Sequence, residues 1–301
     1  MIAIRQGIWA RKAMQESKKH HHVPVFYLSR WSDADGRVHV IRNINGKIVR
    51  SSNTPNYLGF EYYLYSYHED FDAADRAEIE TKFFKPLDNE GARIVSKMFA
   101  GGSLEKRDTI LWVQFLTSMK VRTPENVEKI RTEAQKALIS EIESAQPEYA
   151  KLKQATDPGT AVDWLRVNRP GLIESFGVGQ LPKIASNARA MQDVLSFEWH
   201  VVDFENSSIP LLTSDRPCVY TEGLHKPNCV IALPLSPRHA FFAFRPNSNA
   251  QRVLMKTPTS RLAAGLNESV VGQAVTRAYS QSIGDAPDVF FRRRLSLSSQ
   301  G

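Results

Sequence analysis

Apolar and polar residues alternate with a period of two near the start of the chain. Residues 37–42 (Arg-Val-His-Val-Ile-Arg) follow this pattern, and an apolar segment lies on either side, at residues 23–31 and 47–49. Asn45 and Gly46 precede the third segment and tolerate the positive φ angles of a tight hairpin. The pattern predicts an N-terminal β-meander made of these three segments.

In the middle of the chain the apolar period changes to three and four residues, which is typical of amphipathic helices. Residues 73–85 and 89–99 predict two helices separated by Pro86, and residues 109–120 are apolar on most sides, as in a buried helix. Thr123, Pro124 and Glu125 combine a capping hydroxyl, a proline and an acid, and they predict the start of a helix that reaches about residue 142. A further helix is expected over residues 181–195.

From Phe197 the chain again favours short strands, at residues 197–204, 210–213, 218–220, 229–233 and 239–244, and a helix over 266–279 closes it. Short connections between consecutive strands imply antiparallel pairing. We therefore expect an α+β fold, with a helical middle region packed on a mostly antiparallel sheet. One domain over residues 18–285 is preferred, and the loop at residues 154–159 is the alternative domain boundary.

The net charge of +7 comes from the two ends of the chain. Residues 1–17 are expected to form a flexible extension, residues 286–301 a basic flexible tail, and the 31 basic and 31 acidic residues at positions 20–291 cancel. Charge alone therefore does not predict a nucleic-acid-binding body. No apolar run reaches the roughly 18 residues that span a bilayer, and two cysteines cannot form a disulfide framework. We expect a soluble, cytoplasmic protein without membrane contact.

The sequence contains no P-loop, dinucleotide fingerprint, zinc-peptidase motif or nucleophile elbow. The first candidate for chemistry is the run His20, His21 and His22, in which alternate residues of an extended segment share a face. Imidazole serves as a metal ligand or as an acid or base near neutral pH. The alternative is an exposed basic segment that continues the two preceding lysines.

Two further sets carry candidate chemistry. Asp215, in the polar break Ser-Asp-Arg-Pro at residues 214–217, presents a carboxylate to a metal or substrate, or else caps its own turn. Glu80 and Glu90 lie either side of Pro86, where a bend brings them together, and their alternative fate is a surface ion pair. Arg122 binds an anion bidentately, or else covers the last carbonyl groups of the preceding helix.

Residues 20–28, with the pattern His-His-x-Val-Pro-x-Phe-Tyr-Leu, resemble the opening motif of the domain of unknown function family 4238. The family's other landmarks follow in order: Glu80 and Glu90, Arg122-Thr123-Pro124, Ser214-Asp215-x-Pro217, Pro234-Leu235-Ser236-Pro237 and Asn267. The chain departs from the family at Ser29, where arginine is frequent, and in its glutamates, which are ten residues apart and closer in the family. The resemblance implies a site that favours His20 and His21 over His22 and adds Arg122 and Asp215.

Histidines, acids and an arginine gathered from distant segments are typical of a hydrolytic site. We expect a hydrolase that acts on phosphoesters, of the nuclease or phosphodiesterase type, with nucleic acid or a nucleotide as partner. His20, His21, Glu90, Arg122 and Asp215 form the expected site, and His21 and Asp215 are the expected ligands of a divalent metal. The alternative is a non-enzymatic binding or regulatory protein whose His-Asp-Arg set is structural. A third option is nucleic-acid binding through the basic ends.

Overall fold

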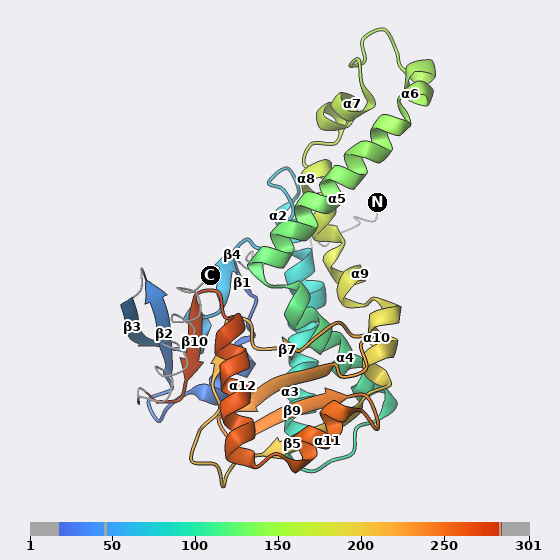
Figure 1. Ribbon diagram of the computed structural model, residues 1–301. Coiled ribbons are helices and arrows are strands. Elements are labelled where there is room, and N and C mark those ends of the chain that lie inside the picture. Colours follow the sequence, from blue (N-terminus) through green and yellow to red (C-terminus); the bar gives the residue numbers. More distant parts are fainter. Residues whose placement is uncertain (1–17, 45–46, 283, 285–301) are drawn as a thin grey trace, which may run out of the picture.

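The computed structural model describes residues 18–44, 47–282 and 284 (Figure 1). The expected extension at 1–17, the expected tail at 286–301 and the Asn45-Gly46 turn lie outside the described residues. The strands are β1 (Lys19–His21), β2 (Val38–Ile44), β3 (Lys47–Asn53), β4 (Phe60–Tyr62), β5 (Glu198–Asp203), β6 (Thr213–Ser214), β7 (Val219–Tyr220), β8 (Val230–Ser236), β9 (His239–Phe244) and β10 (Arg277–Ser280).

The helices lie mainly between the two groups of strands. They are α1 (Val25–Leu28), α2 (Ala73–Arg76), α3 (Lys85–Phe99), α4 (Lys106–Val121), α5 (Pro124–Ser144), α6 (Gln146–Leu152), α7 (Ala161–Asn168), α8 (Leu172–Gly179), α9 (Leu181–Ala185), α10 (Ala188–Leu195), α11 (Asn249–Lys256) and α12 (Thr259–Gln273). A π-helical segment, Ile79–Phe84, runs directly into α3. None of the helices in the described residues has both the length and the apolar character needed to cross a bilayer.

Every strand pair in the described residues is antiparallel. The strand orders are β1-β4, β3-β2-β10-β6 and β5-β9-β8-β7. The predicted α+β class, with a helical middle region and antiparallel sheets, is confirmed. The predicted hairpin is also confirmed, because β2 and β3 pair along their whole length.

The sheet β5-β9-β8-β7 is covered on both faces (Figure 1). Phe241 of β9 packs edge-on against Trp112 of α4, at 5.3 Å between ring centroids. Its neighbour Phe242 faces the other way and joins the apolar cluster that contains Leu266 of α12. Two buried faces explain why β8 and β9 are nearly continuous apolar runs and do not alternate. Figure 1 also shows α5 extending away from this body, with α6 and α7 at its far end.

The segment 23–31 is not the strand that we predicted, and this prediction was wrong. It forms α1 and a following 3₁₀ turn, Ser29–Trp31. A short apolar run reads equally as a buried strand or a buried helix. Here Pro24 precedes the first turn, and burial of Tyr27 and Leu28 on one side stabilises it.

The aromatic residues of this segment connect it to distant strands. The Tyr27 hydroxyl donates to the Pro234 carbonyl at 2.7 Å and lies 2.8 Å from the Thr213 hydroxyl. The Trp31 indole N–H donates to the Leu211 carbonyl at 3.0 Å. The buried hydroxyl and indole N–H are thereby satisfied, so Tyr27 of the opening motif, together with Trp31, links this segment to β6, β8 and the chain before β6.

Three helix predictions need correction at their boundaries. Pro86 does not separate two helices, because the π-helical segment Ile79–Phe84 runs directly into α3 and Pro86 lies within this continuous helical run. The helix expected over 181–195 is two helices, α9 and α10, with Asn187 capping the second. The last helix ends at Gln273, and Tyr279 lies on β10 between β2 and β6.

Candidate functional site

The histidine run begins on β1, which pairs with β4 in a two-stranded sheet. His20 is fully buried, and its Nδ1 accepts a hydrogen bond from the backbone N–H of Tyr65 at 2.9 Å. The Tyr65 ring stacks on the His20 ring at 5.2 Å between centroids. His21 faces the other side of the strand, against the Phe60 ring, and is half-buried. The strand ends there, so His22 lies beyond it.

His21 and His22 are uncharged at neutral pH. Burial lowers the pKa of His21, and the charges of Lys19 and Arg122 act in the same direction. Burial, with Arg122 next in size, lowers the pKa of His22 to about 3. The buried atoms His21 Nε2 and His22 Nδ1 have no hydrogen-bond partner in the structure. Unpaired buried nitrogens of this kind are available to a substrate, a water molecule or an ion.

Arg122 ends α4 and is fully buried. Its Nη1 forms an ion pair with Asp88 at 2.7 Å, and its guanidinium lies 5.5 Å from the centroids of both the Phe84 and Phe115 rings. Its backbone carbonyl accepts a hydrogen bond from the Tyr65 hydroxyl at 3.0 Å. The side-chain Nε has no partner in the structure. Its Nη2 contacts the Met119 sulfur at 2.8 Å. The cation is therefore held in place by two rings, one carboxylate and one thioether sulfur, and its Nε is unpaired.

Glu80 lies in the π-helical segment and is 9% exposed. One of its oxygens, Oε2, is buried without a hydrogen-bond partner. Burial and the nearby carboxylate of Asp88 raise the pKa of Glu80 to about 7, against the opposing effect of Arg122. Burial likewise raises the pKa of Asp88 to about 6 although Arg122 is its ion-pair partner. Two carboxyl groups that titrate near neutrality beside a buried arginine are typical of functional sites.

His20, Tyr65, Glu80, Asp88 and Arg122 are named the β1–α4 cluster below, and His21 and His22 adjoin it. Two of its members, His20 and Arg122, are among the site residues expected from the sequence, and a third, Glu80, was a candidate that the expected site left out. Asp88 was missed. The sequence offers one signal for it, because Asp88 is closer to Glu80 along the chain than Glu90 is, and the paired acids of the family are closely spaced.

Glu90 does not join the β1–α4 cluster. It lies on the surface of α3, where its carboxylate accepts from Arg93 Nε at 2.7 Å and from Arg107 Nη2 at 3.2 Å. These are partly exposed ion pairs, which is the alternative to a site role that we expected for this residue. Of the two glutamates, Glu80 is therefore the buried one, and Glu90 as a site residue stays a prediction.

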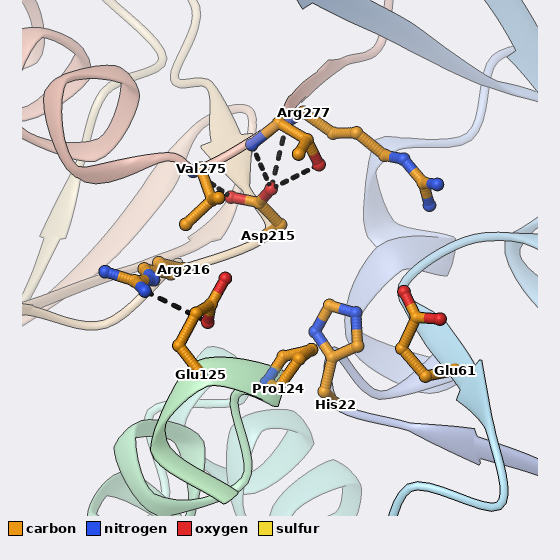
Figure 2. Close-up of a pocket in the computed structure, with 9 residues that line it drawn as sticks. His22, Glu61, Pro124, Glu125, Asp215, Arg216, Val275 and Arg277 are labelled. Carbon is orange, nitrogen blue, oxygen red and sulfur yellow. Dashed lines mark hydrogen bonds and ion pairs between the residues drawn. The ribbon is translucent and has the colours of Figure 1, made fainter. Parts of the chain in front are cut away.

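Asp215 has a backbone-binding role. Its two oxygens accept hydrogen bonds from the N–H groups of Val275, Thr276 and Arg277 at 2.7–2.9 Å, and the Thr276 hydroxyl adds a fourth (Figure 2). The carboxylate therefore fixes the turn between α12 and β10. Asn267 acts similarly, since its side chain bonds the N–H of Leu212 and the carbonyl of Pro210.

We expect Asp215→Asn to lower the free energy of unfolding by about 2–4 kcal/mol, because an amide turns two donors toward a row of backbone N–H groups. Urea unfolding of the purified variant measures this. Asp35→Asn, at an exposed turn, is the matched control and should change stability by less than about 0.5 kcal/mol. Equal stability of the two variants would show that Asp215 does not hold the turn.

A cavity of about 100 Å³ lies where the residue after β1, the start of α5 and the Asp215 turn meet. Its wall includes His22, Asp215 and Arg277, and Figure 2 shows the His22 ring below the Asp215 carboxylate in the view. Glu125, at the start of α5, forms an ion pair with Arg216 at 3.0 Å on one side of the cavity. His22, and not His21, therefore shares a cavity with Asp215.

The described residues contain no group of three or more His, Cys, Asp or Glu side chains that could hold a metal ion. The Asp215 oxygens that we expected to bind a metal are occupied by four hydrogen bonds. A metal held by His21 and Asp215 stays a prediction.

Comparison with known proteins gave one result. The family model described as "Protein of unknown function (DUF4238)" matches residues 19–283. Searches of curated proteins and of solved structures found no match. The family match covers most of the chain and includes β1, the β1–α4 cluster and the Asp215 turn. The chain therefore belongs to the DUF4238 family.

Proposed function

We propose that this protein is a hydrolase that acts on phosphoesters, with its chemistry at the β1–α4 cluster. The observation that carries the proposal is Glu80: a buried carboxyl group on a π-helical segment, with an unpaired oxygen and a pKa raised to about 7. An unpaired buried group reduces stability, and π-helical segments are frequent at functional sites. A functional role explains all three properties together.

The pKa shifts suggest how the roles divide. His21 is neutral with Nε2 unpaired, so it serves as the general base that takes a proton from the attacking water. Glu80 is half-protonated near neutral pH and gives its proton to the departing oxygen of the ester. The pKa of the histidine is lowered and that of the glutamate is raised, which reverses their usual order. A base and an acid with pKa values shifted in this way are suited to these two tasks.

Arg122 supplies the positive charge in this proposal. Its guanidinium is fixed between two rings and retains an unpaired Nε. A fixed cation in a site that excludes water stabilises the negative charge that builds up on a phosphoryl group. Asp88 positions Arg122 through their ion pair.

The cavity lined by His22 is the proposed substrate entrance, because His22 directly follows His20 and His21 of β1. Arg122 lowers the pKa of His22, so the cavity wall lies within electrostatic reach of the buried cation. The guanidinium groups of Arg216 and Arg277 line this cavity beside the carboxylates of Glu61, Glu125 and Asp215. Glu125 is paired with Arg216 and Asp215 with backbone N–H groups, and a guanidinium binds two phosphate oxygens at once. A terminal phosphate or a phosphodiester of a nucleotide or nucleic acid is the proposed substrate.

The wild-type protein tests this directly. It should cleave at least one of bis-p-nitrophenyl phosphate, p-nitrophenyl phosphate, cyclic nucleotides, single-stranded DNA or RNA, assayed with added Mg²⁺ or Mn²⁺ and with a chelator. His21→Ala, prepared identically, should reduce kcat by about 10²–10⁴-fold, the usual contribution of a general base. Failure to cleave any of these substrates, or full activity of His21→Ala, would exclude the proposal.

A non-enzymatic binding or regulatory role is the second candidate. The observation in its favour is the complete burial of His20, Tyr65 and Arg122, because buried polar networks rigidify a core and specify a fold. In that case Glu80 stabilises the protein, and replacing it reduces stability at every pH.

A further inference from the structure

An apolar cavity of about 520 Å³ lies on the other face of the β5-β9-β8-β7 sheet, beneath α11 and α12. Its size falls in the range of roughly 300–1,000 Å³ that is usual for small-molecule sites. The sheet contributes Val219, Val230, Ala232 and Phe242, and the helices contribute Ala250, Val253, Leu254, Leu262 and Leu266.

A basic pocket of about 570 Å³ adjoins this cavity. The two share Asn249, Val253, Thr257 and Arg261 in their walls. Arg252, Lys256 and Arg261 are the charged residues among those lining the two, and no acid in the described residues lines either one. No ion pair is found for these three cations in the described part of the chain. One end of the apolar cavity is thus electropositive.

The roof of the cavity is loosely packed. No residue of α11 is buried, and its Val253 is 55% exposed although it faces the cavity. On α12, a Cβ atom added at Gly265 would meet no atom within 4 Å. Space is therefore left between the helices and the sheet, where a close-packed interior is the norm.

We propose that this groove, the apolar cavity together with its basic end, binds one medium-chain fatty acid. The alkyl chain lies against Phe242 and Leu266, where its burial provides the affinity. The carboxylate lies at Arg252, Lys256 and Arg261, which have no other anion to bind. This inference is independent of the proposed hydrolase, because no residue of the β1–α4 cluster lines the groove.

Isothermal titration calorimetry with laurate, below its micelle concentration, tests the proposal on the full chain. We expect saturable binding of one laurate per chain. Gly265→Leu should fill the space and weaken binding at least about tenfold. Gly272→Leu is the matched control: it lies on the same helix, also with open space at Cβ, but outside the cavity wall. It should bind laurate as the wild type does, and thermal unfolding should show both variants folded.

The head group is tested with Arg261→Ala and with dodecanol. The variant should lose about tenfold in laurate affinity, the loss expected for one hydrogen bond to a charged group. It should bind dodecanol as the wild type does. Absence of laurate binding, or equal effects of Gly265→Leu and Gly272→Leu, would overturn the proposal. So would binding to phosphatidylglycerol vesicles without binding of monomeric laurate, which would indicate a membrane-contacting surface.

Discussion

Arg122→Met should lower the free energy of unfolding by about 3–5 kcal/mol, the usual effect of removing one partner from a buried ion pair. The Asp88 carboxylate would lose its cation, and Glu80 and Asp88 would face each other without a compensating charge. Methionine fills a similar volume between the Phe84 and Phe115 rings, so the loss reports on charge more than on packing. Urea unfolding at neutral pH measures the difference.

Arg107→Met is the matched control for this variant. Its guanidinium is 78% exposed and pairs with Glu90 on the surface, so we expect a change below about 1 kcal/mol. If Arg122→Met does not fold, the double variant Arg122→Met, Asp88→Leu keeps the test decisive, since removing both charges should restore a folded protein. Arg122→Met as stable as Arg107→Met would contradict the buried ion pair.

Glu80→Gln should increase stability at alkaline pH. The folded-state pKa of Glu80 is about 7 against an ordinary value of 4.5. Below the ordinary value both states hold the proton and the carboxyl has no effect. As the pH rises toward 7, the unfolded state releases its proton first, so stability falls and then levels off. Glutamine mimics the protonated carboxyl, and the variant should therefore gain about 3 kcal/mol near pH 8 and nothing near pH 4.

The control is Glu90→Gln. Its carboxylate has two arginine partners on the surface of α3, so the variant should lose up to about 1 kcal/mol near pH 8. Urea unfolding of both variants across this pH range gives the comparison. A loss of stability in Glu80→Gln near pH 8 would mean that Glu80 stabilises the fold, as the non-enzymatic alternative requires.

Local sequence patterns predicted the elements that depend on local chemistry. The hairpin of β2 and β3, the buried helix α4 and the start of α5 at Pro124 follow from period, turn residues and the proline in the first helical turn. The Thr123 hydroxyl, which we expected to cap α5, makes no capping hydrogen bond. The pattern of the apolar segment at 25–31 did not predict a helix, because contacts with distant strands decide its conformation.

The site was harder to predict because it depends on one irregular turn. On a regular α-helix, residues eight apart such as Glu80 and Asp88 lie about 80° apart around the axis. A π-helical segment widens the turn between them, and no residue pattern in the sequence predicts such a segment. The structural role of Asp215 could not be predicted for a related reason. The three N–H groups that donate to its carboxylate come from a turn some 60 residues later in the chain.

The rate of phosphoester cleavage by Glu80→Gln, measured beside Glu90→Gln, tests the central claim most directly. Both variants should be folded near pH 7, where about half of the wild-type Glu80 side chains hold the proton, and the substrate is the one that the wild type cleaves best. We predict that Glu80→Gln loses about 10²–10⁴-fold in kcat, since glutamine cannot donate the proton to the departing oxygen. Glu90→Gln should retain the wild-type rate. Equal rates in the two variants would contradict the assignment of Glu80 as the acid of the site.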